Sequence, residues 1–365
     1  MHTPLRYAFA LILVFTLTCV LFAGNLDIRF KKDHTEIVFQ KINVQSYNSD
    51  KDKNAIVFFT KEPVKKDYIV VDYGVVNHIE MQKNSVIVFL KKRVNYTFSG
   101  DTLFLYPFYP QKGIIKTRIA PVYKKASEKS ELETEVLIGT EVEALKDSKG
   151  WLYINIPEQN DYKGWVNAEF VNLFADTDKK DDYTHIVARK WELFTPDKGD
   201  PYELSAGTNY KLLREDKSRH YIELRNGDRG WIGSQHTIFT STQTLRDRIV
   251  ASTKQFLGTK YVWGGTSSQG IDCSGLTYTV YKIHNIQLPR NSTPQFEISR
   301  KIQRSQLRPG DLVFFQTIAK GPSHVGIFIG GSEFIHAGLE GVVIASLDEP
   351  YFAKRYYGSG VILPD

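Results

Sequence analysis

The stretch Gly270-Ile271-Asp272-Cys273-Ser274-Gly275-Leu276 decides how the C-terminal third of this chain is interpreted. The segment before it is too rich in glycine for a helix, whereas apolar residues recur at helical spacing from Leu276 to Ile283. Cys273 is therefore predicted to lie at the start of a helix, where unpaired backbone N–H groups and the helix dipole stabilise an anion. We expect the pKa of its thiol to fall below the free value, as in a nucleophile. The alternative is a small buried core residue.

Two histidines flank a predicted β-hairpin downstream of the cysteine. Two apolar, β-branched runs between His324 and His336 are joined by Gly330-Gly331-Ser332. A three-residue loop, Ile329 to Gly331, would place Phe328 opposite Ser332 and His324 opposite His336, with both imidazoles on one face. A thiolate needs a base, and the base needs a third polar group to orient it. Each histidine alone is more often structural, so the signal is the set of three.

Further motifs accompany these residues in a fixed order, namely Phe256-Leu257-Gly258-Thr259-Lys260-Tyr261-Val262-Trp263-Gly264-Gly265, Leu288-Pro289-Arg290-Asn291-Ser292 and Arg308-Pro309-Gly310-Asp311-Leu312-Val313-Phe314-Phe315. With them, residues 245–360 resemble the NlpC family of papain-like cell-wall cysteine peptidases. The resemblance covers a whole domain. It implies an α+β papain-like fold for residues 244–365 and hydrolysis of peptidoglycan stem peptides.

The resemblance also assigns roles to residues. It implies that Cys273 is the nucleophile, His324 the general base and acid, and His336 the orienting residue. Tyr261 would form a wall of the site near the oxyanion position. The positions that contact substrate in the subgroup cutting short muropeptides correspond to Asp272, Ser274 and Ser292. Asn291 departs from the pattern, because an acidic residue is expected there.

A degenerate repeat precedes this domain. Ile138-Gly139-Thr140, Trp151-Leu152-Tyr153-Ile154 and Gly164-Trp165-Val166 recur in order as Ala206-Gly207-Thr208, Tyr221-Ile222-Glu223-Leu224 and Gly230-Trp231-Ile232. The segments 114–175 and 183–240 resemble bacterial SH3-like β-barrels. Two such barrels ahead of an NlpC-like domain resemble the γ-D-glutamyl-L-diamino acid endopeptidases. In that architecture the first barrel closes one end of the cleft and selects a free amino terminus, with Tyr162 as the barrel tyrosine. Glu131 and Glu135 are both candidates for the carboxylate that holds the ammonium group.

The N-terminal part carries an export signal and a β-rich region. Residues 8–23 form an apolar run that is short for a membrane span, so residues 1–24 are predicted to be a secretory signal, with an uncleaved anchor as the alternative. Cleavage would leave Cys273 as the only thiol of the two cysteines in the chain, which favours a reactive role. Residues 27–110 read as at least five strands, which we interpret as a small β-sandwich of unknown role.

Composition and motifs exclude several functions. The formal net charge of +6 over 365 residues is modest, and no RNA-binding motif or basic recognition helix accompanies it, so nucleic acid is not an expected partner. Glu333 and His336 have the spacing of helical metal ligands. On a strand, however, they point to opposite faces, so we expect no metal. No Lys-Ser/Thr follows Gly264 to Gly270, so we expect no phosphate loop and no cofactor.

The sequence thus predicts an exported, periplasmic or envelope-associated cysteine endopeptidase. Its fold would comprise an all-β N-terminal domain, two SH3-like barrels and an α+β papain-like catalytic domain. By resemblance it would cut the γ-D-Glu to diamino acid bond in fragments with a free L-Ala amine. One alternative is an enzyme that acts on intact wall and uses its barrels for docking. The other is a non-catalytic wall-binding protein. Which diamino acid is accepted stays open, as does the choice between recycling, remodelling and attack on foreign wall.

Overall fold

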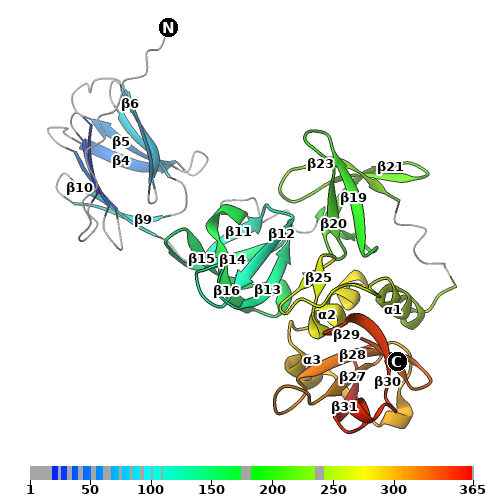
Figure 1. The fold of residues 1–365 in the computed structure, drawn as a ribbon. Helices are drawn as coiled ribbons and strands as arrows, with labels where there is room; N and C mark the ends of the chain where they lie inside the picture. Colours follow the sequence, from blue (N-terminus) through cyan, green and yellow to red (C-terminus); the bar gives the residue numbers. More distant parts are fainter. Residues whose placement is uncertain are drawn as a thin grey trace. The chain divides into compact units, whose positions relative to one another are not determined.

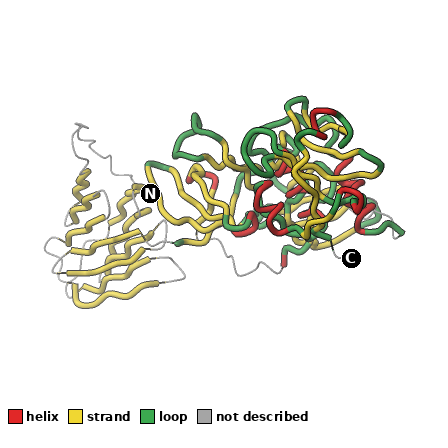
Figure 2. The backbone as a smooth tube through the Cα atoms, turned by 90° about the horizontal axis from the view of Figure 1, so that it is seen from below, coloured by secondary structure: helices red, strands yellow, loops and turns green. Residues whose placement is uncertain are grey.

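A computed structural model of the chain describes ten strands between residues 19 and 107, and then residues 110–173, 182–234 and 242–363. The chain divides into two compact units, Met1–Tyr109 and Pro110–Asp365 (Figure 1). Every described element of the first unit is a strand, whereas helices occur in the second (Figure 2). The predicted signal lies outside the described residues up to residue 18.

The first unit contains two five-stranded sheets. One has the order β1 (Cys19–Ala23), β2 (Leu26–Phe30), β3 (Thr35–Phe39), β10 (Thr102–Pro107), β9 (Val94–Ser99). The other has the order β4 (Val44–Asp50), β5 (Ala55–Thr60), β8 (Ser85–Leu90), β7 (Val76–Gln82), β6 (Asp67–Tyr73). The expectation of at least five strands in residues 27–110 is confirmed, and these strands contain the β-branched and aromatic residues that favour them.

Two small β modules open the second unit. The first module, residues 110–173, is a seven-stranded sheet in the order β13 (Leu132–Leu137), β12 (Ile119–Tyr123), β16 (Tyr162–Asn167), β15 (Trp151–Ile156), β14 (Glu141–Ser148), β11 (Gln111–Ile115), β17 (Val171–Leu173). The second module, residues 182–234, is a six-stranded sheet in the order β18 (His185–Ile186), β21 (Asn209–Glu215), β22 (Arg219–Glu223), β23 (Arg229–Gly233), β19 (Trp191–Pro196), β20 (Tyr202–Ser205).

The expected repeat appears in the strand register of both modules. Equivalent residues are Lys146, Tyr153 and Trp165 in the first module and Arg214, Tyr221 and Trp231 in the second. In each, the tyrosine pairs with the tryptophan across the ladder, and a register shift precedes the cation. The cation lies over the indole ring at 5.3 Å in the first module and 4.9 Å in the second. The repeat is therefore confirmed as one local architecture used twice.

The C-terminal module, residues 242–363, packs helices against a six-stranded antiparallel sheet. The sheet order is β26 (Arg300–Ile302), β31 (Tyr356–Val361), β27 (Leu312–Phe315), β28 (His324–Gly330), β29 (Glu333–Gly338), β30 (Gly341–Ser346). The helices are α1 (Leu245–Lys254), α2 (Cys273–Ile283), α3 (Ser292–Ile298) and α4 (Pro350–Ala353), and β24 (Thr266–Ser267) pairs with β25 (Gly270–Ile271). The predicted α+β fold is thus present (Figure 1).

The sheet of this module separates two cores. Alternate residues of β27 point to opposite faces, so Leu312 and Phe314 join the cluster with α1 and α2, while Val313 and Phe315 join the cluster with α4. Helix α1 begins after Thr244, with a complete capping box between Thr244 and Asp247. Because α2 is buried almost throughout, its N-terminus is held firmly against the sheet.

Candidate active site

Cys273 is the first residue of α2, as predicted. Asp272 caps the helix, and its carboxylate accepts hydrogen bonds from the N–H groups of Gly275 at 2.7 Å and Gly264 at 2.9 Å. A Cβ at position 275 would lie 2.2 Å from the Gly265 carbonyl oxygen, so glycine is required where the loop crosses the first turn. The glycine-rich sequence on both sides of the cysteine therefore builds the turn that presents the thiol.

The environment of the thiol reverses the expected direction of its pKa. Cys273 is only 9% exposed, and burial, followed by the Asp272 charge, raises the pKa of the thiol to about 12. Backbone N–H groups of Val325 and Ser274 oppose that rise, and so does Arg290. The helix N-terminus lowers the pKa of the thiol, as expected, but burial raises it by more. Burial in this conformation therefore favours the neutral form of the thiol.

His324 and His336 meet, although through a different register from the one predicted. Phe328 pairs with Phe334 rather than Ser332, and Gly330 pairs with Glu333, because the register shifts between Phe328 and Gly330. The two histidines are therefore offset along the ladder instead of directly opposed. Their rings still share one face, with His324 Nε2 3.0 Å from His336 Nδ1.

The contact between the two rings indicates which ring nitrogens must carry a proton if His324 is to act as a base. If His324 donates from Nε2 to His336 Nδ1, its own Nδ1 is left as a lone pair for proton transfer. Nδ1 of His336 must then carry no proton, so that it can accept this hydrogen bond. Burial lowers the pKa of His336 to about 4 and that of His324 to about 3, and the neighbouring imidazole further lowers that of His324. The rings of Phe334 and Phe352 lie 5.2 Å and 5.1 Å from the His336 ring and keep it in place.

Three further predicted substrate positions, Tyr261, Ser274 and Ser292, lie in the same module as Cys273. Tyr261 forms an isolated bridge with Ile271, and burial, followed by the negative charge that a Cys273 thiolate would carry, raises the pKa of its hydroxyl. Ser274 lies beside Asp272, with its hydroxyl 3.2 Å from the carboxylate. Ser292 begins α3, and its hydroxyl donates to the Pro322 carbonyl at 2.7 Å.

Tyr162 reaches the C-terminal module from β16, and its carboxylate partner is Glu133. The Tyr162 hydroxyl donates to Glu133 at 2.6 Å and bonds with Asn291, and burial, followed by Glu133, raises its pKa to about 12. The two glutamates considered in the sequence, Glu131 and Glu135, have other hydrogen-bond partners. Glu131 pairs with Lys124 at 2.9 Å on an exposed loop, and Glu135 accepts from the Thr266 N–H at 3.0 Å. Glu133 was missed because the three glutamates alternate along one segment and only the pairing of β13 distinguishes them.

The first module is joined to α2 at both ends of the helix. Near the nucleophile, Arg290 donates to Thr134 of β13 at 2.8 Å. Near the other end, Glu158 accepts from Lys282 at 2.9 Å and from the Tyr278 hydroxyl at 3.3 Å. Glu158 follows β15 in the short helix η1 (Pro157–Gln159). The first module is therefore a fixed wall beside the nucleophile helix.

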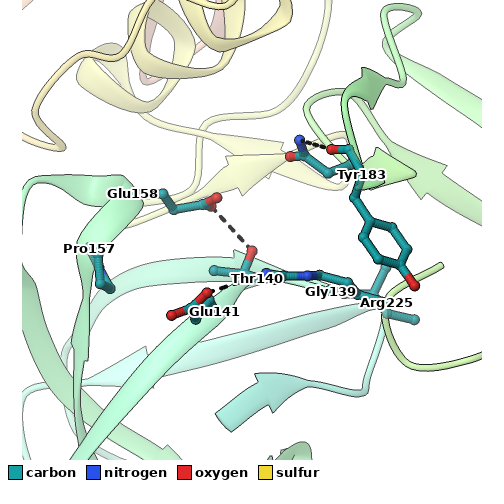
Figure 3. Close-up of a pocket in the computed structure, with 9 residues that line it drawn as sticks. Gly139, Thr140, Glu141, Pro157, Glu158, Tyr183 and Arg225 are labelled. Carbon is teal, nitrogen blue, oxygen red and sulfur yellow. Dashed lines mark hydrogen bonds and ion pairs between the residues drawn. The ribbon is translucent and has the colours of Figure 1, made fainter. Parts of the chain in front are cut away.

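A cavity of about 80 Å³ lies between the first and the second β module. Figure 3 shows Glu158 bonded to Thr140, with Arg225 of the second module passing beside Glu141. Arg225 and Glu141 form an ion pair at 3.5 Å, and Tyr183 closes the far side. None of the three proposed catalytic side chains lines this cavity, so its polar groups join the modules rather than reach the thiol.

Two absences apply to the described ranges alone. Within residues 110–173, 182–234 and 242–363 and the ten N-terminal strands, no group of three or more His, Cys, Asp or Glu could hold a metal ion. Over the same ranges, no helix is both long and apolar enough to cross a bilayer.

Comparison with known proteins gives a consistent result. The model of the NlpC/P60 family matches residues 258–361. A gamma-D-glutamyl-L-lysine dipeptidyl-peptidase of Bacillus cereus is 31% identical over 254 residues, which cover 64% of this chain and 76% of that protein. A murein DD-endopeptidase/murein LD-carboxypeptidase of Escherichia coli is 40% identical over 114 residues, 31% of this chain and 60% of that protein.

Among solved structures, an NlpC/P60 family protein from Bacillus cereus superimposes with a TM-score of 0.61 at 27% identity. The match covers 69% of this chain and 100% of that one, so it extends well beyond the C-terminal module. Together with the cysteine at the head of α2 and the paired histidines, these matches show that the chain belongs to the NlpC/P60 family of cysteine peptidases.

Proposed function

We propose that this protein hydrolyses the γ-D-Glu to diamino acid bond of peptidoglycan stem peptides, in fragments that carry a free N-terminal L-Ala. Cys273, His324 and His336 would be the catalytic residues, and the two β modules would be SH3-like barrels. The relative from Bacillus cereus, a gamma-D-glutamyl-L-lysine dipeptidyl-peptidase, supports this bond and this chain architecture. The relative from Escherichia coli is a murein DD-endopeptidase/murein LD-carboxypeptidase, which supports the substrate class.

The proposed reaction uses the neutral Cys–His pair. As the Cys273 sulfur attacks the γ-carbonyl carbon of D-Glu, its proton passes to His324 Nδ1. The tetrahedral intermediate collapses when His324 returns this proton to the leaving amine of the diamino acid. Water, deprotonated by His324, then hydrolyses the thioester and releases L-Ala-D-Glu. His336 accepts the Nε2 proton of His324 throughout, and the Tyr261 hydroxyl would face the developing oxyanion.

The hydrogen bond between Tyr162 and Glu133 is the observation that supports a substrate with a free N-terminal amine. This bond of 2.6 Å places a carboxylate from the first module beside Asn291 of the C-terminal module. A carboxylate in a half-buried wall favours a substrate ammonium and excludes an acetylated or glycan-linked amine, because either would leave the carboxylate without a cation. Asp272, Ser274 and Ser292 would contact the peptide between this pair and the thiol.

Cleavage of intact wall is the second candidate. It would use the barrels only to hold the enzyme near the polymer. The contacts of Arg290 with Thr134 and of Lys282 with Glu158 weigh against it, since a docking module needs no attachment at both ends of the nucleophile helix. The substrate class favours export to the cell envelope, through the apolar segment 8–23 as a cleaved signal or a retained anchor.

Three peptides test the proposal, namely L-Ala-γ-D-Glu-diaminopimelate, its N-acetylated form, and the same stem linked to glycan. Initial rates by chromatography should favour the free peptide by about a hundredfold or more, since the blocked amine loses its charge-assisted hydrogen bond with the half-buried carboxylate and adds bulk beside it. The tripeptide with L-Lys should be compared in the same assay to determine the diamino acid. Equal rates on free and blocked stems would instead support the docking enzyme.

A further inference from the structure

Arg290 is almost fully buried at the contact between the first module and α2. It is 1% exposed, although arginine is seldom buried without partners. Its guanidinium donates from Nε to Thr134 Oγ1 at 2.8 Å, and from Nη1 to Asp272 Oδ1 and to Ser274 Oγ, both at 3.0 Å. From Nη2 it donates to Asp272 Oδ2 at 2.6 Å and to the Gly265 carbonyl at 3.4 Å. All five N–H groups of the side chain therefore have acceptors.

These acceptors belong to two different parts of the site. Asp272 and Ser274 flank the nucleophile in the chain, and Asp272 caps its helix. Thr134 lies on β13 between Glu133 and Glu135, and its hydroxyl also bonds with Gln159 at 2.9 Å. Glu133 contacts Tyr162, so a single guanidinium separates the proposed ammonium pocket from the nucleophile's helix cap.

We propose that Arg290 is a positioning residue that couples the ammonium pocket to the cap of α2. It holds Asp272 at the cap and, through Thr134, fixes β13 so that Glu133 faces the cleft. The inference rests on the proposed function, because it explains how the free-amine pocket keeps its distance from the scissile bond. A lysine cannot replace the arginine, since one ammonium group cannot reach five acceptors in a planar fork.

Arg290 also has an electrostatic role that does not depend on substrate. The charged and titratable groups near the thiol are Asp272, Arg290, Tyr261 and, on the strand that supplies the Val325 N–H, His324. The Asp272 charge raises the pKa of Cys273 and Arg290 lowers it. Weakening the Arg290–Asp272 pair should therefore make the thiol still harder to ionise.

Two variants and a control separate these roles. Thr134→Val removes the acceptor for Arg290 in the first module, together with the Thr134–Gln159 hydrogen bond, and leaves the pair of Arg290 with Asp272 intact. Arg290→Lys weakens the hydrogen bonds of this side chain with Thr134 and with Asp272. Arg246→Lys is the matched control, because Arg246 forms a second Arg–Asp pair in the same module, with Asp311 at 2.7 Å, and contacts none of the proposed site residues.

For each purified protein we would measure kcat and KM on free and N-acetylated tripeptide, and the pH dependence of Cys273 alkylation by iodoacetamide. Thr134→Val should raise KM for the free peptide by roughly tenfold at nearly unchanged kcat, the loss expected for one hydrogen bond to a charged group, and should not shift the alkylation profile. Arg290→Lys should lower the selectivity for the free amine and shift the alkylation profile to higher pH. Arg246→Lys should change neither.

The outcomes distinguish this inference from the proposed function. If the wild type prefers the free peptide and Thr134→Val keeps the same preference and KM, the coupling is wrong while the function stands. If Arg290→Lys alkylates with the wild-type profile, the electrostatic role is wrong. If the wild type cuts free and blocked peptides equally, the ammonium pocket itself is wrong, and the coupling fails with it.

Discussion

Replacing Glu133 by glutamine should remove most of the preference for a free amine. The substitution preserves the size of the side chain and leaves an amide oxygen for the Tyr162 hydroxyl, which now donates to the carboxylate at 2.6 Å. What is lost is the charge opposite the substrate ammonium. A hydrogen bond between charged groups in a half-buried wall contributes about 2 kcal/mol, or roughly thirtyfold in kcat/KM.

The assay compares kcat/KM on L-Ala-γ-D-Glu-diaminopimelate and on its N-acetylated form. Glu133→Gln should lose roughly thirtyfold on the free peptide and stay within about threefold on the blocked one, where no ammonium is present. Glu131→Gln is the matched control. Glu131 pairs with Lys124 through side chains that are 45% and 58% exposed, and exposed pairs of this kind contribute little.

An unchanged ratio in Glu133→Gln would refute the ammonium pocket, provided that the variant unfolds at the wild-type temperature. An equal loss on both peptides would also refute it, because that pattern reports damage to the catalytic residues rather than to amine recognition. If Glu131→Gln, and not Glu133→Gln, abolished the preference, the identification of the carboxylate would be wrong.

Three further predictions concern the histidines and the thiol. His324→Ala should lose roughly 10⁴-fold in kcat, whereas His336→Gln, which can still accept the Nε2 proton, should keep part of the rate; equal losses would contradict an orienting role. Alkylation of Cys273 in the free enzyme should increase up to and beyond pH 9, because burial raises the pKa of the thiol to about 12, and a plateau reached by pH 7 would contradict a neutral thiol. Because the folded pKa of His336 is lowered from 6.5 to about 4, stability should fall as pH drops from 6.5 to 4, by about 3 kcal/mol at the lower end, and chemical unfolding of His336→Gln should show a smaller fall.

Local signals in the sequence were sufficient for the elements that present the thiol. The glycine-rich turn and the helix that begins at Cys273 depend on residues within a few positions of one another, and both lie where they were expected. The hairpin was also predicted, but its register was wrong. The shift between Phe328 and Gly330 adds a residue to one strand, and nothing in the Gly-Gly-Ser sequence specifies which side receives it.

The features that were missed depend on tertiary contacts. Glu133 bonds with Tyr162 from another strand of the first module, and Arg290 reaches Thr134 only when β13 lies against the turn before α2. The changed direction of the Cys273 pKa also depends on tertiary packing, here within the C-terminal module. Its place at a helix terminus is local, whereas its burial results from packing against β28.

The central claim is that Cys273 cuts one particular bond, and mass spectrometry of a defined peptide tests it most directly. After incubation of L-Ala-γ-D-Glu-diaminopimelate with the wild type, the account predicts two products, L-Ala-D-Glu and free diaminopimelate. Cys273→Ala, which should fold normally, is predicted to yield neither. Cleavage at the L-Ala to D-Glu bond, or undiminished turnover by Cys273→Ala, would contradict the account.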